Sequence, residues 1–492
     1  MNGLLPEQVA RAHLAAGRAK EALLAIEPAA KVPNASHTVL DSYANALRAL
    51  GRGHDRLAVR RRAAVDFPDS GVAWHNLAAA LGDLGSWIEA GQACQRAFAA
   101  GQDAPETWLV YSRALAGQNL LEAAGGALDE ALRRRPGYID ALAQKSKLIW
   151  AITNDADQAA AVFPGHPTYL IYIADTYRIA GQADRALALL NEGTRREPND
   201  LNLQHALAGV ALDQGKLELA TTAAAAALNL APSHPVSLEA WASACLASGH
   251  INEAFAASGR LVEVQPFSQT ALALHATTAR LAGALDYDRL YDYEQFVRTY
   301  DIAAPSGWNS VDAFMIDLAA ALASLHTISG QPPEQSLRLG TQTPGDLRAF
   351  DLPALDGFFA AVDPLIRAHL TALGSGQDPV RARNTGDYAM TGCWSIRLGA
   401  GGHHVDHIHP HGWLSSAFYV QVPPETDADD SREGWLQFGR PSYRGLVGLE
   451  PAHFKRPVPG RLVLFPSYMW HGTIPFTSPD PRMTIAFDLT PA

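Results

Sequence analysis

A repeat of 34 residues runs through the N-terminal part of the chain and constrains the fold more than any other feature of the sequence. Glycines recur at this spacing at Gly17, Gly51 and Gly85, and again at Gly181, Gly215, Gly249 and Gly283. Prolines keep the same step at Pro164, Pro198, Pro232 and Pro266. A fixed period of this length is typical of a solenoid, in which each unit packs only against its neighbours.

Each repeat has the pattern of two helices joined by a turn. In one unit, apolar side chains lie at helical spacing from Trp74 to Leu81, and Gly85 can end that helix in the left-handed conformation. Small residues such as Ala90 and Ala97 follow at the spacing of a second helix. These Trp, Leu, Gly and Ala positions, with the proline that follows, resemble the tetratricopeptide repeat (TPR).

We therefore expect an all-α TPR solenoid over residues 1–268, which have room for about eight units. Capping helices and a linker should follow over residues 269–302. The distance from Pro136 to Pro164 is 28 residues instead of 34, so one unit should be short. Solenoids offer extended concave binding surfaces, so the TPR resemblance implies a peptide or protein partner in the groove.

The composition narrows the partners and the compartment. A formal net charge of -11 argues against a nucleic-acid partner, which would require a basic surface. The three cysteines are far apart and lack the spacing of a metal site, which indicates a reducing compartment. The sequence shows neither a signal-peptide pattern at its start nor an apolar run long enough to cross a membrane. We therefore expect a cytoplasmic protein that binds neither membranes nor nucleic acid.

The 34-residue period is lost over residues 303–492. Residues 311–328 and 352–373 have the apolar spacing of amphipathic helices. The remaining sequence alternates short β-prone runs with turns rich in glycine and proline, which indicates a sandwich or barrel. The prediction is a multidomain chain, in which the solenoid is followed by a double-stranded β-helix (jelly-roll) domain with supporting helices.

A cluster of histidines begins the densest β-prone part of this domain. Five histidines and one aspartate lie between residues 403 and 411. In a strand, residues i and i+2 point to the same side, so two pairs are candidates for metal ligation: His404 with Asp406, and His407 with His409. A third ligand must come from a distant strand, and His471 directly follows an apolar, β-prone run.

A buried cation follows the third candidate ligand. Arg482 lies eleven residues beyond His471, in the apolar run RMTIAF. Its guanidinium could hold a carboxylate in a bidentate fork. Thr484 lies on the same side of that strand and could donate its hydroxyl, and Tyr419 is placed on another strand where its hydroxyl could assist. Three ligands on one side of a metal leave positions open for a co-substrate and dioxygen.

Residues 394–491 resemble the Fe(II)/2-oxoglutarate-dependent oxygenase superfamily, and within it a bacterial and phage branch often fused to TPR repeats. The motifs that carry the resemblance stand in the expected order as HIHPHGWLSSAFYV, GRLVLFPSYMWHG and RMTIAF. The branch motif favours His407, His409 and His471 as metal ligands. The superfamily pattern H-x-D is matched literally by His404 and Asp406, which with His471 form the alternative set. With the first set, Asp406 would orient an imidazole.

The resemblance implies Fe(II), 2-oxoglutarate as co-substrate and O2, with Arg482 holding the far carboxylate of 2-oxoglutarate beside Thr484 and Tyr419. The activity it implies is that of a dioxygenase that hydroxylates a peptide or protein side chain recruited by the TPR region. Two alternatives stay open: the same chemistry on a small molecule, with the repeats used for assembly, and an inactive TPR interaction protein. Further residues expected near the co-substrate, the substrate or the cavity wall are Arg338, Gln342, Thr343, Trp394, Trp413 and Trp470.

Overall fold

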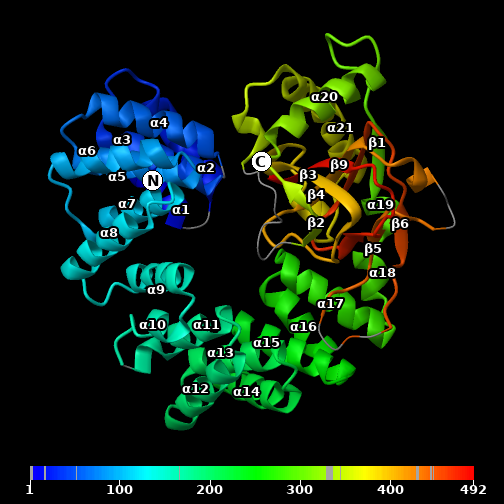
Figure 1. The fold of residues 1–492 in the computed structure, drawn as a ribbon. Coiled ribbons are helices and arrows are strands. Elements are labelled where there is room, and N and C mark those ends of the chain that lie inside the picture. The colour runs from blue at the N-terminus through cyan, green and yellow to red at the C-terminus, as the bar shows by residue number, and fades with distance from the viewer. Residues whose placement is uncertain are drawn as a thin grey trace. The chain divides into compact units, whose positions relative to one another are not determined.

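The computed structural model describes residues 4–15, 18–50, 52–165, 167–327, 336–343, 345–427, 431–443, 446 and 448–492. By the contacts among its residues the chain divides into two units, residues 1–196 and 197–492. The first unit is helical, and the second joins helices to antiparallel sheets (Figure 1).

Helices that pair with their neighbours along the chain make up the first unit. They are α1 (Pro6–Ala15), α2 (Ala19–Ala30), α3 (His37–Ala49), α4 (Gly53–Asp66), α5 (Gly71–Asp83), α6 (Trp87–Ala99), α7 (Pro105–Gly117), α8 (Leu121–Arg134), α9 (Ile139–Thr153), α10 (Ala156–Ala160), the 3-10 turn Pro167–Tyr169, α11 (Leu170–Ile179) and α12 (Ala183–Arg196). The unit predicted to be short, between Pro136 and Pro164, contains α9 and the five-residue α10.

The local sequence explains where these helices begin and end. The hydroxyls of Ser36 and Ser70 accept hydrogen bonds from backbone N–H groups in the first turns of α3 and α5, which is a common way to cap a helix. Gly85, between α5 and α6, has φ of 74°, a left-handed conformation that glycine adopts without steric cost. Ala90 and Ala97 of α6 are fully buried. Their small side chains let the neighbouring helices approach α6 closely.

The second unit begins with more helical repeats and ends with strands. Its helices are α13 (Leu201–Asp213), α14 (Leu217–Leu230), α15 (Pro235–Ala247), α16 (Ile251–Val264), α17 (Gln269–Ala282), α18 (Asp286–Leu290), α19 (Tyr293–Phe296), α20 (Val311–Leu325) and α21 (Pro353–Leu373), with 3-10 turns at Leu347–Ala349, Arg381–Arg383 and Pro424–Asp427. Its strands are β1 (Arg298–Asp301), β2 (Leu337–Gln342), β3 (Tyr388–His404), β4 (Leu414–Gln421), β5 (Leu436–Phe438), β6 (His453–Lys455), β7 (Arg461–Pro466), β8 (His471–Thr473) and β9 (Arg482–Pro491).

The strands form two antiparallel sheets. The larger sheet has the order β1-β7-β4-β9-β3-β2, and the smaller has the order β6-β5-β8. Strand β9 lies between β3 and β4, so Thr484 stands opposite both Ile396 and Tyr419. This antiparallel arrangement is consistent with a jelly roll. The predicted fold class, helical TPR repeats followed by such a domain with supporting helices, is confirmed.

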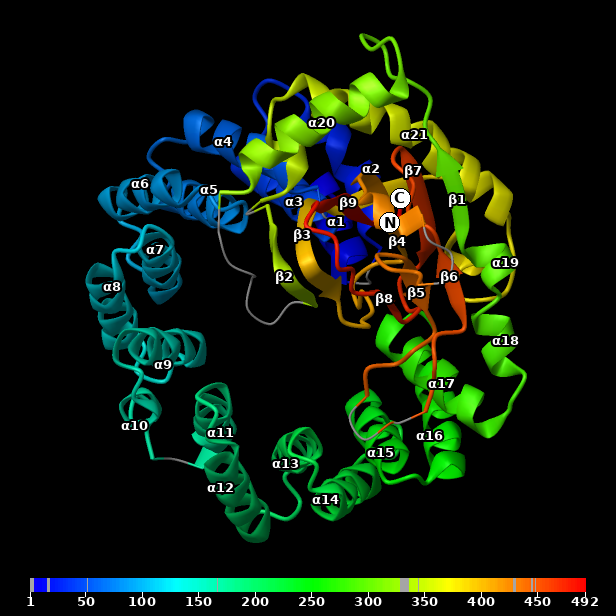
Figure 2. The same cartoon turned by 45° about the vertical axis from the view of Figure 1, so that its right-hand side comes forward.

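Helices α20 and α21 cover the larger sheet. Figures 1 and 2 show both helices on one side of the strands, opposite α17. Phe314 of α20 and Phe358 of α21 are fully buried in the main core, and the Phe358 ring lies 5.0 Å from the ring of Phe418 in β4. Burial of such aromatic side chains contributes about 1.5–3 kcal/mol each, so these helices stabilise the sheet.

Helix α17 belongs to two cores at once. Its Ala271 and Leu274 pack in the cluster formed by α15 and α16, as in any helical repeat. Its Leu272 and Ala276 pack in the main core, which also contains side chains of β4, β7 and β9. The last helical repeat therefore continues into the β domain through a shared apolar interior.

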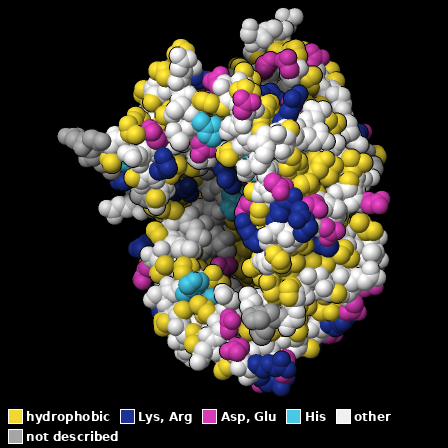
Figure 3. Space-filling model, turned by 90° about the vertical axis from the view of Figure 1, so that its left-hand side faces the viewer, with side chains coloured by type: hydrophobic (Ala, Val, Ile, Leu, Met, Phe, Trp, Pro, Cys, Tyr) yellow, Lys and Arg dark blue, Asp and Glu magenta, His cyan; other side chains and the backbone are white. Residues whose placement is uncertain are grey.

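Charged side chains of both signs lie next to one another on one face of the molecule (Figure 3). Figure 3 shows one face of the molecule, on which the described lysine and arginine side chains lie beside aspartates and glutamates instead of forming one broad basic patch. None of the described helices has the length and apolar character needed to cross a bilayer.

Candidate metal centre

Three histidines from two separate segments meet at one end of the sheets. His407 and His409 follow the end of β3, and His471 is the first residue of β8. The segments are joined by reciprocal backbone hydrogen bonds: the His407 N–H donates to the His471 carbonyl at 2.9 Å, and the His471 N–H donates to the His407 carbonyl at 3.0 Å. The backbone therefore fixes residues 64 positions apart as direct neighbours.

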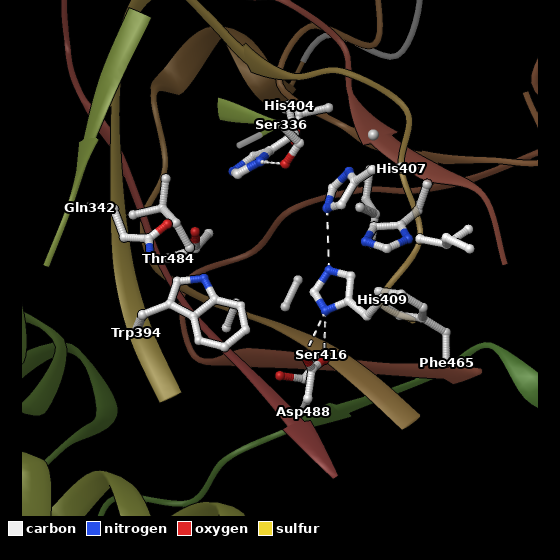
Figure 4. Close-up of a pocket in the computed structure, with 18 of the residues that line it drawn as sticks. Ser336, Gln342, Trp394, His404, His407, His409, Ser416, Phe465, Thr484 and Asp488 are labelled. Atoms are coloured by element: carbon white, nitrogen blue, oxygen red, sulfur yellow. Dashed lines mark hydrogen bonds and ion pairs between the residues drawn. The ribbon is translucent and has the colours of Figure 1, made fainter. Parts of the chain in front are cut away.

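The imidazoles of His407, His409 and His471 converge. Their ligand nitrogens lie within 4.8 Å of one another, and the ring centroids are 4.3 Å apart for His407 and His471 and 5.1 Å apart for the other two pairs. The Nε2 atoms of His407 and His409 are 3.2 Å apart (Figure 4). Two nitrogens that each bind one metal at about 2.1 Å would be separated by about 3 Å, so the arrangement suits a single ion.

Each imidazole is oriented through its Nδ1 atom. The His407 Nδ1 lies 2.8 Å from the Val405 carbonyl, and the His471 Nδ1 lies 2.9 Å from the Met469 carbonyl. The His409 Nδ1 lies 2.6 Å and 2.8 Å from the two oxygens of Asp488. Carbonyl and carboxylate oxygens only accept, so Nδ1 carries the proton in all three rings and Nε2 is left as the ligand atom.

Burial keeps the His407 and His471 rings neutral. Desolvation lowers the pKa of His407 to about 3, and it lowers the pKa of His471 well below the usual value for histidine. The neutral imidazole is the form that binds a metal.

A cavity of about 550 Å³ lies beside the three imidazoles. Arg482 lines it and is only 2% exposed. Its Nε has no hydrogen-bond partner among the described residues, and none of their carboxylates forms an ion pair with its guanidinium. A buried cation without a counterion is costly, so this arginine is suited to an anion that enters the cavity.

Two residues predicted to hold a carboxylate together with Arg482 lie next to it. Thr484 is buried and lines the same cavity. Tyr419 is fully buried and is not among the described residues that line the cavity, but its ring centroid lies 5.1 Å from the Arg482 guanidinium carbon. At this distance the Tyr419 ring makes a cation–π contact with the Arg482 guanidinium and so helps to hold it in place.

The alternative ligands do not join the cluster of His407, His409 and His471. His404 lines the cavity, with its Nδ1 3.0 Å from the Ser336 hydroxyl and its ring 5.6 Å from the ring of His407. Asp406 is 8% exposed, and its oxygens accept hydrogen bonds from Gln437 and Arg440. The expected role of Asp406, to orient an imidazole, is taken by Asp488.

Other predicted residues are divided between the cavity and the surrounding structure. Gln342 and Trp394 line the cavity, and the Trp394 ring lies 6.1 Å from that of His409 (Figure 4). The described residues that line the cavity do not include Arg338, Thr343, Trp413 or Trp470. The indoles of these two tryptophans instead donate to the Val380 carbonyl and the Thr277 hydroxyl, respectively.

Asp488 is the site residue that sequence reasoning missed, although the signal for it was present. Arg482 and Thr484 were placed on one side of the final strand by their spacing. The same alternation continues through Ala486 to Asp488, and all four residues line the cavity.

Comparisons with known proteins agree with this description of the β domain. Residues 392–488 match the model of a family described as "Putative 2OG-Fe(II) oxygenase", where 2OG stands for 2-oxoglutarate. A comparison with curated protein sequences gives no match.

Several solved structures of TPR proteins are similar to part of the chain. A TPR protein described as having an unusual peptide-binding site, YrrB, is 16% identical with a TM-score of 0.25, over 37% of this chain and 97% of that one. The C-terminal part of a TPR protein from Cytophaga hutchinsonii is 15% identical with a TM-score of 0.30, over 47% and 98%. Yeast Tom70 is 15% identical with a TM-score of 0.37, over 52% and 56%.

The chain therefore combines helix pairs that follow a 34-residue period, as TPR repeats do, with a C-terminal segment that matches a family of 2OG-Fe(II) oxygenases.

Proposed function

We propose that this protein is an Fe(II)- and 2-oxoglutarate-dependent dioxygenase that hydroxylates a side chain of a peptide or protein recruited by the TPR region. The observation that carries the proposal is the pairing, in one cavity, of three convergent imidazoles with a buried arginine that has no counterion among the described residues.

The donor set fits Fe(II). His407, His409 and His471 would hold the ion through Nε2, with their Nδ1 atoms already engaged. Imidazole ligands suit iron, and three of them leave other coordination positions for a co-substrate and dioxygen. When bound, the iron supplies the activation of O2, with 2-oxoglutarate as the source of electrons. Three neutral ligands leave the full charge of the ion in place, which favours a dianionic co-substrate.

Arg482 fits the distal carboxylate of 2-oxoglutarate. The guanidinium offers a planar fork of donors, and Thr484 on the same strand offers a hydroxyl. Apolar side chains form part of the cavity wall, among them Ile396, Leu436 and Phe465. Such walls exclude water, and exclusion of water strengthens the electrostatic contacts inside.

The peptide or protein substrate is supported by the repeats, since solenoids of this kind present extended binding surfaces. The runner-up is a small-molecule substrate, because a cavity of about 550 Å³ is of the size that holds small ligands. A catalytically inactive interaction protein is the third possibility, and the intact set of three histidines and Arg482 opposes it.

Succinate formation tests the proposal. The purified protein would be incubated with Fe(II), ascorbate, 2-oxoglutarate and O2, with and without candidate protein or small-molecule substrates, and succinate and substrate mass would be measured. The wild type should form succinate and the His471→Ala variant should not. Equal succinate from both proteins, or none from the wild type with any substrate, would reject an oxygenase.

The role of the repeats is tested separately. Arg113→Glu and Lys147→Glu reverse the charge of exposed side chains on α7 and α9, which are the first helices of their pairs. A substrate recruited by the repeats should show a raised KM in these variants, whereas a small molecule that enters the cavity directly should be turned over at the wild-type rate.

A further inference from the structure

The segment that carries His471 is held from outside the sheets by the end of the helical repeats. Residues 468–470 lie between β7 and β8, directly before the candidate metal ligand. Four hydrogen bonds join this segment to α17 and to the chain around α18, and all four involve buried groups. The backbone of His407, in contrast, pairs with His471 itself.

Tyr291 makes two of these hydrogen bonds with one hydroxyl. The Trp470 backbone N–H donates to the Tyr291 oxygen at 2.9 Å, and the Tyr291 hydroxyl donates to the Tyr468 carbonyl at 3.2 Å. Burial raises the pKa of Tyr291 well above its usual value, so the hydroxyl keeps the proton that it donates. The two backbone groups that it joins flank Met469, whose carbonyl orients the His471 Nδ1.

Thr277 of α17 holds the same segment through a side chain. The Trp470 Nε1 donates to the Thr277 hydroxyl at 3.2 Å, and that hydroxyl donates to the Ala273 carbonyl of its own helix at 2.8 Å. The hydroxyl is therefore fixed with a lone pair toward the indole. The Tyr468 hydroxyl completes the set by donating to the Leu290 carbonyl at 2.7 Å.

The same helix also holds the strand next to this segment. Arg280 of α17 donates to the Gly439 carbonyl at 2.7 Å, and the Gly439 N–H donates to the Trp470 carbonyl at 2.8 Å. Trp470 is thus held by α17 on its indole, by Tyr291 on its N–H and by Gly439 on its carbonyl.

We infer that Thr277 and Tyr291, which belong to the end of the helical repeats, are positioning residues for the candidate metal ligand His471. They act through the backbone of residues 468–470 and the Met469 carbonyl, which sets the direction of the His471 ring. The inference rests on the proposed metal site. Groups that orient a metal-bound imidazole typically change metal affinity by about 10- to 100-fold when they are removed.

Co(II) binding to the full-length protein provides the test, because it is measured without turnover. Affinity would be determined by calorimetric titration, and the visible absorption of bound Co(II) would report the geometry of its ligands. Thr277→Val keeps the shape of the side chain and removes the acceptor, and Tyr291→Phe removes both hydrogen bonds. Each variant should bind Co(II) about tenfold more weakly and show a changed spectrum, and Thr277→Ser should restore both.

Thr278→Val is the matched control. Thr278 is the next residue of α17 and is equally buried, but its hydroxyl bonds to Ser258 and to the His275 carbonyl inside the repeats. Tyr300→Phe is the control for tyrosine, because that hydroxyl bonds to His369 away from the segment. Both controls should bind Co(II) as the wild type does.

The outcomes separate the two claims. If the wild type binds no Co(II), the proposed metal site is wrong, and the positioning role is lost with it. If the wild type binds Co(II) and Thr277→Val matches it in affinity and spectrum, the positioning role alone is wrong. Weaker binding by Thr278→Val to the same degree would also overturn it, because loss of stability in α17 would then explain the effect.

Discussion

The Asp488 carboxylate accepts the Nδ1–H of His409 at 2.6 Å, whereas the rings of His407 and His471 are held by backbone carbonyls. Asp488 also accepts from the Ser415 hydroxyl at 2.7 Å, which fixes the carboxylate across β4 and β9. One imidazole of the candidate centre therefore has a charged partner, and that partner makes it the most electron-rich ligand of the three.

Asp488→Asn should weaken metal binding by about 10- to 100-fold, because the amide orients the ring less well and carries no charge. The affinity for Co(II) or Fe(II) would be measured under anaerobic conditions. Asp387→Asn is a suitable control, since Asp387 is largely exposed and pairs with Arg367. Unchanged affinity in Asp488→Asn would show that Asp488 is not coupled to the metal.

Single substitutions of the histidines should decide between the two ligand sets. Alanine at His407, His409 or His471 should remove the bound metal, while His404→Ala should keep one equivalent per chain. Metal content after gel filtration, measured by mass spectrometry, gives the answer. Loss of metal in His404→Ala together with retention in His409→Ala would favour the set that contains His404 and Asp406.

Arg482→Met should lower the affinity for 2-oxoglutarate by about tenfold or more, because a charge-assisted pair contributes about 1.5–3 kcal/mol. Metal affinity should stay the same. The same change should raise the free energy of unfolding of the ligand-free protein by about 1 kcal/mol, since a buried cation without a partner is replaced by an apolar side chain.

Arg461→Met is the control for that experiment, because Arg461 lies on β7 and already pairs with Asp301. It should leave 2-oxoglutarate binding unchanged and should not stabilise the protein. If Arg482→Met binds 2-oxoglutarate as tightly as the wild type does, another group holds the distal carboxylate.

His369 should make the protein less stable in acid, independently of any metal. His369 lies on α21, its Nδ1 bonds to the hydroxyl of Tyr300 on β1 at 3.1 Å, and burial lowers its pKa to about 3. The unfolded chain binds a proton at this residue below pH about 6.5, so unfolding takes up a proton between these two values. The free energy of unfolding should fall by about 1.4 kcal/mol for each unit of decreasing pH in that range.

Urea unfolding of wild type and His369→Leu at pH 4.5, 5.5 and 6.5 would measure this effect. The variant should show a smaller dependence on pH, by about 1.4 kcal/mol per unit. Identical pH dependence in the two proteins would mean that His369 is protonated in the folded state.

The sequence was sufficient to predict the helical repeats and to single out the three histidines that converge in the structure, for different physical reasons. Glycine adopts a positive φ at little cost, so glycines such as Gly85 can end helices. Because such glycines recur every 34 residues, the sequence predicts a series of helix pairs. The cluster at His407 and His409 could be linked to His471 only by the apolar run before His471 and by a family resemblance, because no local rule connects segments so far apart. Their adjacency in the fold depends on a backbone pairing between the end of β3 and the start of β8.

Two features could not be predicted from the sequence because they depend on tertiary packing: the partner of His409 and the second packing surface of α17. Asp406 and Asp488 are both plausible partners for an imidazole, and only the register of β9 against β4 brings Asp488 to His409. Likewise, helical periodicity predicts that α17 packs on α16, but it does not predict which surface covers its other side. That side is covered by the segment around Trp470.

The dual membership of α17 limits how this protein can be divided. A fragment that starts after Ala282 would retain every candidate ligand, yet it would leave Trp470 and the core residues that pack on Leu272 and Ala276 open to water. The smallest piece able to keep the oxygenase-type domain intact thus begins inside the repeat array. Exchange of repeats would be tolerated only upstream of that helix, so the domain with the candidate metal centre carries the last helix of the repeat array with it as a permanent component.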